Sequence, residues 1–265
     1  ICLTYNHEKF LSDAIKGFLI QQTSFPYEIV FHDDASTDGT RFFILELQRQ
    51  YPKIVRFVLQ KENIYSTAGN VLLHAISACR GKYISFCEGD DYWTDPNKLE
   101  KQVSSLEANP DFVITYADCQ PFDENGEIDA DFGGARRDLS AQELKKAPPI
   151  FTLTACFRNV LKIPPEAAMA KYGDLFMWSL LGHYGKGKYL PDIQKSRYRV
   201  HSGGVHSSAN QSSRADMKAL TLAALLAYYK RINDPDLIIY FRRNLLNFCI
   251  IEKIKEMPFS GTLIK

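Results

Sequence analysis

Short apolar runs rich in β-branched and aromatic residues alternate, over the first 118 residues, with stretches in which apolar residues recur every three or four positions. The runs predict strands and the periodic stretches predict amphipathic helices. This order predicts an α/β fold with a doubly wound, mostly parallel sheet flanked by helices. The expected strands are 1–4, 27–32, 54–59, 83–87 and 112–117, and the expected helices are 8–21, 39–50, 67–79 and 97–107.

The second half of the chain is less regular. Asn125-Gly126 predicts a turn, and the polar residues 129–149, with paired glycines and prolines, predict a mobile surface segment. Residues 151–157 resemble a strand, and 172–181 are typical of a loop that enters a helix. Two amphipathic helices are expected within 214–255.

These elements divide the chain into a main domain and an appendage. We expect one domain at 1–208, with halves at about 1–118 and 119–208, followed by a helical extension at 209–265. The extension could cap the second half, form a dimer contact or rest on a membrane surface. Capping is the default for helices with one apolar face.

Two acidic residues, Asp90 and Asp91, follow the expected strand 83–87. In an open α/β sheet, ligands bind outside the carboxyl ends of the strands. Neighbouring carboxylates at that place suit a hard cation such as Mn²⁺ or Mg²⁺, which in turn can hold a phosphate. The alternative is an ordinary solvated turn.

A second acidic cluster follows the expected strand 27–32. Asp33 and Asp34 come directly after its apolar residues, and Ser36 and Asp38 precede an apolar helical pattern. Asp34 can therefore accept hydrogen bonds from a base or a ribose at the strand end. Ser36 and Asp38 could serve only as helix caps.

Composition narrows the functional classes. The chain has 265 residues, 45% hydrophobic and 24% charged, with a net charge of +1, which is ordinary for a soluble globular protein and gives no reason to expect a nucleic-acid partner. No apolar run could span a membrane. No Gly-x-Gly-x-x-Gly or Gly-x-x-x-x-Gly-Lys motif occurs, which counts against a classical dinucleotide domain and a P-loop NTPase.

Six cysteines without CxxC spacing are expected to be reduced, mostly core residues of a cytoplasmic protein, with no zinc site. The chain opens at Ile1 without a Met or a signal peptide, and its first strand looks cut short. We therefore expect that residues are missing at both ends.

Five short motifs, in order, resemble those of the family 2 inverting glycosyltransferases, which have the GT-A fold. The likeness covers about residues 1–208. The motifs are Thr4-Tyr5-Asn6, the Asp-Asp-Ala-Ser-Thr-Asp-Gly-Thr segment at 33–40, Gly-Lys-Tyr-Ile at 81–84 followed by Asp90-Asp91, the Asp174…Trp178 helix, and Tyr-Arg-Val-His at 198–201.

The resemblance implies a metal-dependent transfer of a sugar from a nucleotide-diphosphate donor, most simply a UDP-sugar, to a hydroxyl of a glycan or lipid-linked acceptor. It implies a non-processive hexosyltransferase of cell-surface polysaccharide biosynthesis, working in the cytoplasm or at the inner face of the membrane. Two alternatives are a nucleotide-sugar binding module without catalysis and a nucleotidyltransferase. The latter would need a Gly-rich, basic loop near the N-terminus, which residues 1–25 do not offer.

The resemblance also implies a role for each matching residue. Those of the nucleotide-sugar site are Thr4, Tyr5 and Asn6 around the nucleobase, Asp34 on the base edge with Asp33 in support, and Asp90 on the ribose or sugar. Asp91 would bind the metal, Asp174 would be the general base, and His201 would be a further metal or diphosphate contact. Tyr5 could instead pack, and His201 could have a structural role. Trp93 and Trp178 are expected in the core.

Three positions depart from the family pattern. Leu3 replaces a Pro, Gly69-Asn70 replaces an Arg-Asn pair, and Gly173 precedes Asp174 where Glu is more common. The second change removes a cation that could contact the diphosphate. The Gln-x-x-Arg-Trp motif of processive polymerases does not occur, which argues against a polysaccharide synthase with a channel.

Overall fold

The computed structural model describes residues 1–65, 71–204 and 210–256. Its first layer is a parallel sheet in the order β1-β2-β3, made of Cys2–Thr4, Ile29–Asp33 and Val55–Leu59. Helices α1 (Leu11–Leu19) and α2 (Thr40–Gln50) connect these strands. Every residue of β2 is buried, as expected for a strand covered on both faces.

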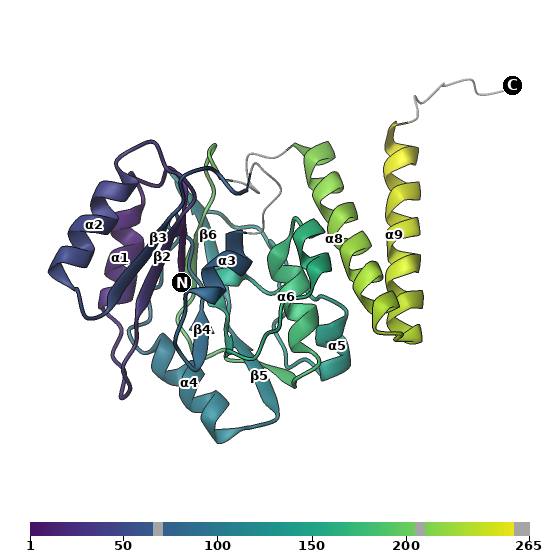
Figure 1. Cartoon of the computed structure of the whole chain (residues 1–265), viewed down its shortest axis with the longest axis horizontal. Helices are drawn as coiled ribbons and strands as arrows, with labels where there is room; N and C mark the ends of the chain where they lie inside the picture. The colour runs from purple at the N-terminus through teal and green to yellow at the C-terminus, as the bar shows by residue number, and fades with distance from the viewer. Residues whose placement is uncertain (66–70, 205–209, 257–265) are drawn as a thin grey trace, which may run out of the picture.

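A second sheet has the order β4-β8-β5-β9, made of Tyr83–Ser85, Cys156–Arg158, Phe112–Tyr116 and Lys186–Tyr189. Strand β8 is antiparallel to both its neighbours, whereas β5 and β9 are parallel. The backbone N–H of Cys87 donates to the Ile1 carbonyl (3.0 Å) and that of Gly89 to the Leu3 carbonyl (2.9 Å). These bonds join the two sheets, which gives the α/β, mostly parallel architecture that the sequence predicted (Figure 1).

A third, smaller sheet pairs β10 (Ser196–Arg199) with β6 (Cys119–Asp123) in parallel, and β6 with β7 (Gly126–Glu127) in an antiparallel turn. The turn lies at Asn125-Gly126, as predicted, and Gly126 has a φ of 121° that favours glycine. A bridge between Tyr92 and Arg197 brings β10 beside the segment that follows β4. Strands β9 and β10 were not predicted.

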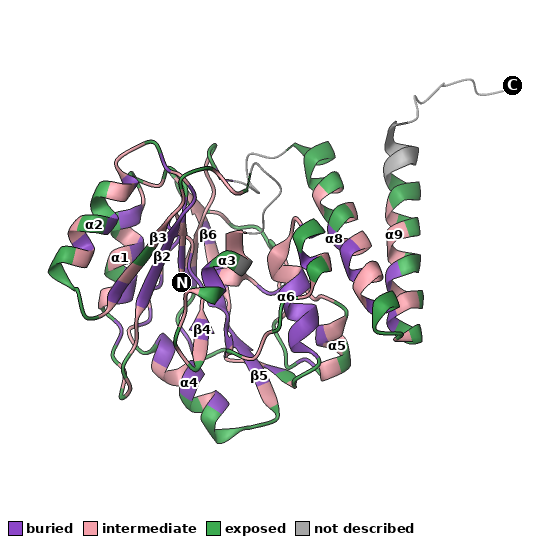
Figure 2. Cartoon of the chain, in the orientation of Figure 1, coloured by how far each residue is buried: buried purple, intermediate pink, exposed green. Residues whose placement is uncertain are grey.

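The remaining helices of the main domain pack on the second sheet or, in the case of α3, also on β1 and β2 of the first sheet. They are α3 (Val71–Ser77), α4 (Lys98–Ala108), α5 (Ala141–Lys145) and α6 (Gly173–Leu181), with short 3-10 turns at Thr152–Thr154 and Pro165–Met169. Burial concentrates on the strands and on α6 (Figure 2). Trp178 and Trp93 are both buried, which confirms that they belong to the core.

Two predictions in this region need correction. We predicted a mobile surface segment at 129–149, and this is wrong for residues 139–145. Ser140 and Glu143 form a capping box that starts α5, and Leu139 and Leu144 are buried. The strand expected at 151–157 begins only at Cys156. The start of the helix expected at 67–79, with Gly69-Asn70, lies outside the described residues.

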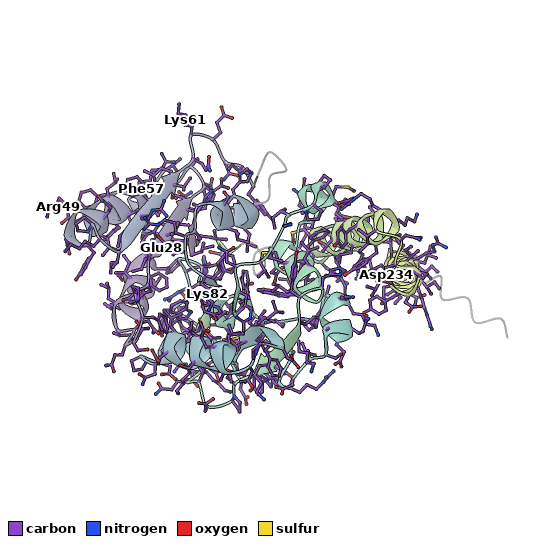
Figure 3. All side chains as sticks on the ribbon, turned by 60° about the horizontal axis from the view of Figure 1, so that its bottom comes forward. Glu28, Arg49, Phe57, Lys61, Lys82 and Asp234 are labelled. Atoms are coloured by element: carbon purple, nitrogen blue, oxygen red, sulfur yellow. The ribbon has the colours of Figure 1, made fainter. Side chains whose placement is uncertain are left out.

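The C-terminal region forms two long helices, α8 (Gln211–Arg231) and α9 (Pro235–Glu256), as predicted. Helix α8 packs on α6, where Phe176 and Leu180 share a cluster with Leu225 and Tyr229. Helix α9 packs on α8 at the edge of the molecule, and the Asp234 turn that joins them lies at the opposite end from Arg49 of α2 (Figures 1 and 3). In the described part of the chain, no helix is both long and apolar enough to cross a membrane.

All six cysteines are free, and four of them are buried as expected: Cys2, Cys87, Cys119 and Cys156. Cys249 on α9 is exposed.

Candidate active site

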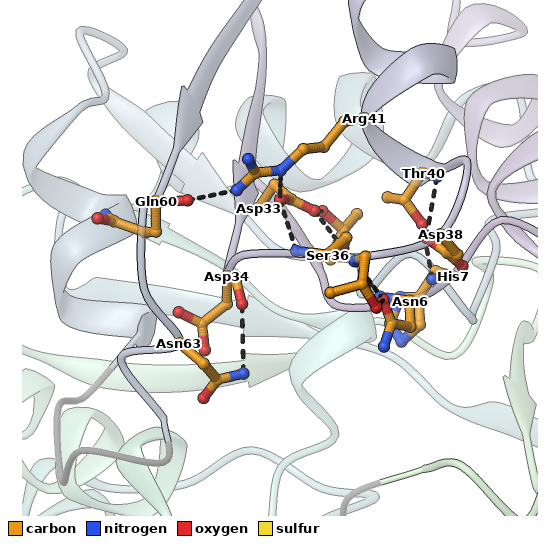
Figure 4. A network of polar contacts seen from close by, with 12 residues as sticks. Asn6, His7, Asp33, Asp34, Ser36, Asp38, Thr40, Arg41, Gln60 and Asn63 are labelled. Atoms are coloured by element: carbon orange, nitrogen blue, oxygen red, sulfur yellow. Dashed lines mark hydrogen bonds and ion pairs between the residues drawn. The ribbon is translucent and has the colours of Figure 1, made fainter.

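Asp33 organises the loop that leaves β2. Its carboxylate is fully buried and accepts hydrogen bonds from Thr4 Oγ1 (3.1 Å), the Ser36 backbone N–H (3.0 Å) and the Ser36 hydroxyl. Arg41 Nε pairs with the same carboxylate at 2.7 Å (Figure 4). These bonds fix the Thr4 side chain and the start of the loop after β2, because they occupy the acceptor positions of the buried Asp33 carboxylate.

Asp34, the next residue, orders the loop after β3. Its two carboxylate oxygens accept the backbone N–H groups of Ile64 (2.7 Å) and Tyr65 (3.0 Å), and Asn63 Nδ2 donates to its carbonyl (3.2 Å). Only 3% of the residue is accessible. Asp34, which was predicted to meet the base, thus already accepts two backbone N–H groups. Each of its carboxylate oxygens has a second lone pair that can accept a further hydrogen bond.

Tyr5 and Asn6 lie at the rim above Asp33. Tyr5 is 46% exposed, so it does not pack in the core. Asn6 adopts a positive φ of 55°, its backbone N–H donates to Ser36 Oγ (2.9 Å), and its side-chain oxygen accepts the Thr37 N–H (2.8 Å). The exposed ring of Tyr5 is therefore carried on a turn that Asn6 holds in place.

The start of α2 positions a residue that the sequence did not single out, His7. The backbone N–H of His7 donates to Thr40 Oγ1 (2.8 Å), and Asp38 accepts the N–H groups of Thr40 (3.0 Å) and Glu8 (3.1 Å). Asp38 therefore accepts the N–H of the first residue of α2, although the N-cap position itself is Gly39 and has no side-chain cap. These bonds hold the loop that carries the His7 ring (Figure 4).

The Asp90 carboxylate lies between two imidazoles. His201 Nε2 is 3.0 Å from Asp90 Oδ2, and His7 Nε2 is 3.7 Å from the same oxygen. Burial raises the pKa of Asp90, but the His201 hydrogen bond and the nearby His7 outweigh it, so the pKa is lowered. Burial lowers the pKa of His7, against the opposing effect of Asp90. The buried Nδ1 of His7 has no hydrogen-bond partner among the described residues.

Asp91 has different neighbours. It is 3% exposed, and its Oδ1 accepts the backbone N–H of Arg199 in β10 (2.7 Å). Arg199 Nε also donates to the Asp90 carbonyl (2.8 Å), and its Nη2 pairs with Asp13 of α1 (2.9 Å). Burial, followed by the charges of Asp90 and Glu88, raises the pKa of Asp91 well above its usual range. Strand β10 therefore clamps the turn that carries both acids.

The two predicted metal ligands have different partners in this structure. His201 contacts Asp90, whereas Asp91 accepts the Arg199 N–H. Among the residues described, no three His, Cys, Asp or Glu side chains already form a metal cage. One carboxylate oxygen between two imidazole nitrogens nevertheless offers the ligand types that Mn²⁺ accepts. The His7 nitrogen without a partner among the described residues is Nδ1, whereas Nε2 is the one that faces Asp90, so a cation at this carboxylate would need further ligands from the oxygens of a bound molecule.

Asp174 lies in the first turn of α6, as predicted, and Thr152 Oγ1 donates to its Oδ2 at 3.4 Å. Burial raises the pKa of this carboxyl. The same effect, together with the charge of Asp90 and a smaller contribution from Asp174, raises the pKa of Glu88 to about 8. The charge of Asp174 in α6 therefore contributes to the raised pKa of Glu88, which lies in the segment after β4.

Glu88 was not predicted as a site residue, although its place two residues before Asp90 is a usable signal. His7 was also missed, and its signal is the turn directly after the Thr4-Tyr5-Asn6 motif.

Comparison with known proteins identifies the family of the chain. The model of the family "Glycosyl transferase family 2" matches residues 1–161. An uncharacterized protein of Mycobacterium tuberculosis is 34% identical over 234 residues, covering 85% of this chain and 67% of the relative. The Escherichia coli protein WfgD, a UDP-Glc:alpha-D-GlcNAc-diphosphoundecaprenol beta-1,3-glucosyltransferase, is 28% identical over 206 residues, covering 77% of this chain and 78% of WfgD.

The fold also has solved counterparts. The mannosyltransferase PcManGT from Pyrobaculum calidifontis, solved with GDP-Man and Mn²⁺, superposes with a TM-score of 0.60 at 19% identity. The match covers 88% of this chain and 63% of PcManGT, so the chain spans somewhat under two thirds of that structure. Because the family model matches more than half of this chain, the chain belongs to glycosyl transferase family 2 and has the GT-A fold.

Proposed function

We propose that the protein is a metal-dependent, inverting hexosyltransferase that moves a sugar from a nucleotide-diphosphate donor to a hydroxyl acceptor. The observation that carries this proposal is the convergence of His7 and His201 on one carboxylate oxygen of Asp90. In addition, the charge of Asp174 contributes to the raised pKa of Glu88. Asp90 and the two histidines can hold the groups that stabilise a charged leaving group, and Asp174 can accept a proton.

The donor would lie over the carboxyl ends of β1 and β2. The exposed Tyr5 ring offers a face for the base, on the turn held by Asn6, and Asp34 offers a carboxylate oxygen to the base edge while it orders the 63–65 loop. We favour UDP as the nucleotide because WfgD, which spans most of this chain, is named for a UDP-Glc donor. Thr4 and Asp33 support this pocket from below.

A divalent cation, Mn²⁺ or Mg²⁺, would be held by Asp90 and His201, with His7 beside them and Asp91 fixing the turn. When bound, it would neutralise the negative charge that grows on the departing diphosphate. The chain's own contribution is to hold the Asp90 carboxylate ionised, since its pKa is lowered by the His201 hydrogen bond despite burial. Asp90 could also reach the ribose or the donor sugar.

Asp174 would act as the general base. Its carboxylate would take the proton from the acceptor hydroxyl as that oxygen attacks the anomeric carbon from the face opposite the diphosphate. A single displacement of this kind inverts the anomeric configuration. The raised pKa of Asp174 suits this role because a more basic carboxylate accepts a proton more readily.

The acceptor would be a glycan or a lipid-linked sugar in non-processive synthesis of cell-surface polysaccharide. The support is the name of WfgD, whose acceptor is a GlcNAc-diphosphoundecaprenol. A protein with such an acceptor would work in the cytoplasm at the inner face of a membrane, and the 214–255 helices could provide either a membrane contact or a dimer contact.

The test is transfer or hydrolysis of a panel of UDP-sugars with Mn²⁺ by the wild-type protein and by Asp174→Asn. We expect turnover to fall by about 10²–10⁴-fold in the variant while UDP binding is kept. The matched control is Asp236→Asn, an exposed acid in the first turn of α9. Full turnover in Asp174→Asn would remove Asp174 as the base, and binding without turnover by the wild-type protein would indicate a nucleotide-sugar binding module.

A further inference from the structure

Helix α9 presents an apolar face that no other element covers within residues 1–65, 71–204 and 210–256. Leu237 and Phe241 are buried against α8, whereas Ile239, Leu246 and Ile250 are 63%, 57% and 56% exposed. The three exposed residues are spaced by seven and four positions, so they form one stripe along the helix. An exposed apolar stripe of this kind on a helix indicates a surface that contacts another protein or a membrane.

Arginines are the charged residues of the middle of α9, whereas Asp236 and Glu252 lie toward its two ends. Arg242 and Arg243 are exposed beside the stripe, and the sequence from Leu237 to Ile251 contains no Asp or Glu. Among the side chains that the structure describes, no carboxylate forms an ion pair with either arginine. The face therefore combines large aliphatic side chains with two unneutralised guanidinium groups.

The far end of α9 lies on the active-site side of the molecule. Helix α8 starts beside the loop after β3, where Tyr65 Oη is 3.5 Å from Met217 Sδ, and α9 runs back toward that side (Figure 1). That loop is the one ordered by Asp34. The second half of the stripe, at Leu246 and Ile250, is thus toward the same side as the carboxyl ends of the parallel strands.

We propose that the outer face of α9 docks on an anionic lipid surface, with Ile239, Leu246 and Ile250 at the boundary between headgroups and acyl chains and both arginines on lipid phosphates. This deepens the proposed function, on which it rests, by naming the surface that would bring the site to a lipid-linked acceptor. An interfacial helix binds through buried apolar area and attraction of Arg to anionic lipid.

A second copy of the chain is the less favourable occupant. In a two-fold dimer centred near Arg242 and Arg243, these residues would meet the same arginines of the second copy, and the stretch from Leu237 to Ile251 has no acid to offset them. Anionic lipid supplies the missing negative charge.

The experiment is co-sedimentation of the full chain with vesicles of phosphatidylcholine and phosphatidylglycerol in equal parts, and with vesicles of phosphatidylcholine alone. We expect the wild-type protein to partition onto the anionic vesicles. Arg242→Gln/Arg243→Gln should weaken this partition about thirtyfold, at roughly 1 kcal/mol for each arginine. Leu246→Ser/Ile250→Ser should weaken it by at least about tenfold.

The matched control is Phe42→Ser on α2, because Phe42 is also exposed, at 69%, but lies at the opposite edge of the molecule. This variant should bind as the wild type does. Equal partition of the two α9 variants and the wild type, or no partition at all, would overturn the proposal. A dimer in light scattering that Leu246→Ser/Ile250→Ser dissociates would assign the face to a second copy instead.

Calorimetry with UDP and Mn²⁺ in the absence of vesicles separates this proposal from the proposed function. The α9 variants should bind UDP as the wild type does, since none of the changed residues contacts the site. Vesicle binding without UDP binding would contradict the transferase proposal alone, and UDP binding without vesicle binding would contradict the docking proposal alone.

Discussion

His201 Nε2 lies 3.0 Å from Asp90 Oδ2, although 111 positions separate the two residues in the chain. Two features make this contact. Strand β10 pairs beside the Asp90 turn through Tyr92 and Arg197, and the His201 ring lies against Phe10, with ring centroids 4.6 Å apart. The central contact of the candidate site therefore depends on the junction between the segment after β4, in the second sheet, and β10 of the third sheet.

From this contact we predict that Asp90→Asn lowers the affinity for UDP in the presence of Mn²⁺ by at least about tenfold. The amide keeps the size of the side chain but loses the charge that faces the two imidazoles. Isothermal titration calorimetry with and without Mn²⁺ measures the effect, which should vanish when the metal is left out.

Asp91→Asn is the comparison. The Asn oxygen can still accept the Arg199 N–H, and the change removes a buried carboxyl whose pKa is raised, so we expect no loss of fold stability and no loss of metal-dependent affinity. If Asp91→Asn alone abolished the metal-dependent affinity and melted like the wild type, the cation would be assigned to Asp91, as the sequence resemblance implies.

The pH dependence of turnover should follow Asp174. Burial raises the pKa of this carboxyl above its usual 3.8, and only the ionised form accepts a proton, so kcat should rise with pH through an acidic limb centred above 3.8. Thr152→Val removes a donor to the ionised carboxylate and should move that limb to higher pH. Steady-state rates from pH 4 to 8 test this, and an identical limb in both proteins would contradict it.

Much of this arrangement was predictable from the sequence, for a local reason. Asp33, Asp34, Asp90 and Asp91 come directly after apolar runs, and parallel strands put their carboxyl ends at one edge of a sheet. The burial of Trp178 follows in the same way from the apolar pattern of α6. The sequence pattern was sufficient to predict the place of a side chain wherever a single helix or strand decides which way that side chain faces.

Other features are decided by contacts between distant segments. Strand β10 reads Ser-Arg-Tyr-Arg, without a run of apolar residues, and exists because it pairs with β6. For the same reason the sequence could not tell which of Asp90 and Asp91 meets His201, since the direction of each carboxylate depends on how Arg199 holds the turn. Such pairings have no signal within a single segment.

Lys98 leads to a prediction about stability rather than activity. This residue is fully buried, its Nζ donates to Gln102 Oε1 (2.7 Å) and Ser85 Oγ (3.2 Å), and it lies 4.2 Å from the centre of the Trp93 ring. Burial lowers its pKa from 10.5 to about 8. Between these two values the folded state binds fewer protons than the unfolded state, so the contribution of Lys98 to stability rises with pH across this window.

We therefore expect the free energy of unfolding of the wild type to gain roughly 3 kcal/mol between pH 8 and 10.5, relative to Lys98→Met. The Met variant keeps the contact with Trp93 but has no titrating group at this position. Urea unfolding at several pH values measures the difference. Lys61→Met, which changes an exposed lysine at the periphery (Figure 3), should follow the wild type, and parallel curves for the wild type and Lys98→Met would contradict the assignment.

Arg199 is the residue that we expect to position the Asp90 turn. Its guanidinium stacks on Phe10 (4.7 Å) and Phe122 (4.5 Å) while it bonds Asp13 and the Asp90 carbonyl. A Lys at this position keeps the charge but cannot make the planar stack and the two bonds together.

Arg199→Lys should therefore weaken Mn²⁺-dependent UDP binding by about tenfold and lower the free energy of unfolding by roughly 1–3 kcal/mol. Its neighbour Arg197, whose side chain pairs only with the exposed Glu127 among the described carboxylates, offers a matched control as Arg197→Lys, with a change of at most about 0.5 kcal/mol. Calorimetry and urea unfolding on the same preparations separate the two effects. Loss of stability with unchanged metal-dependent affinity would mean that Arg199 supports the fold without positioning the acids.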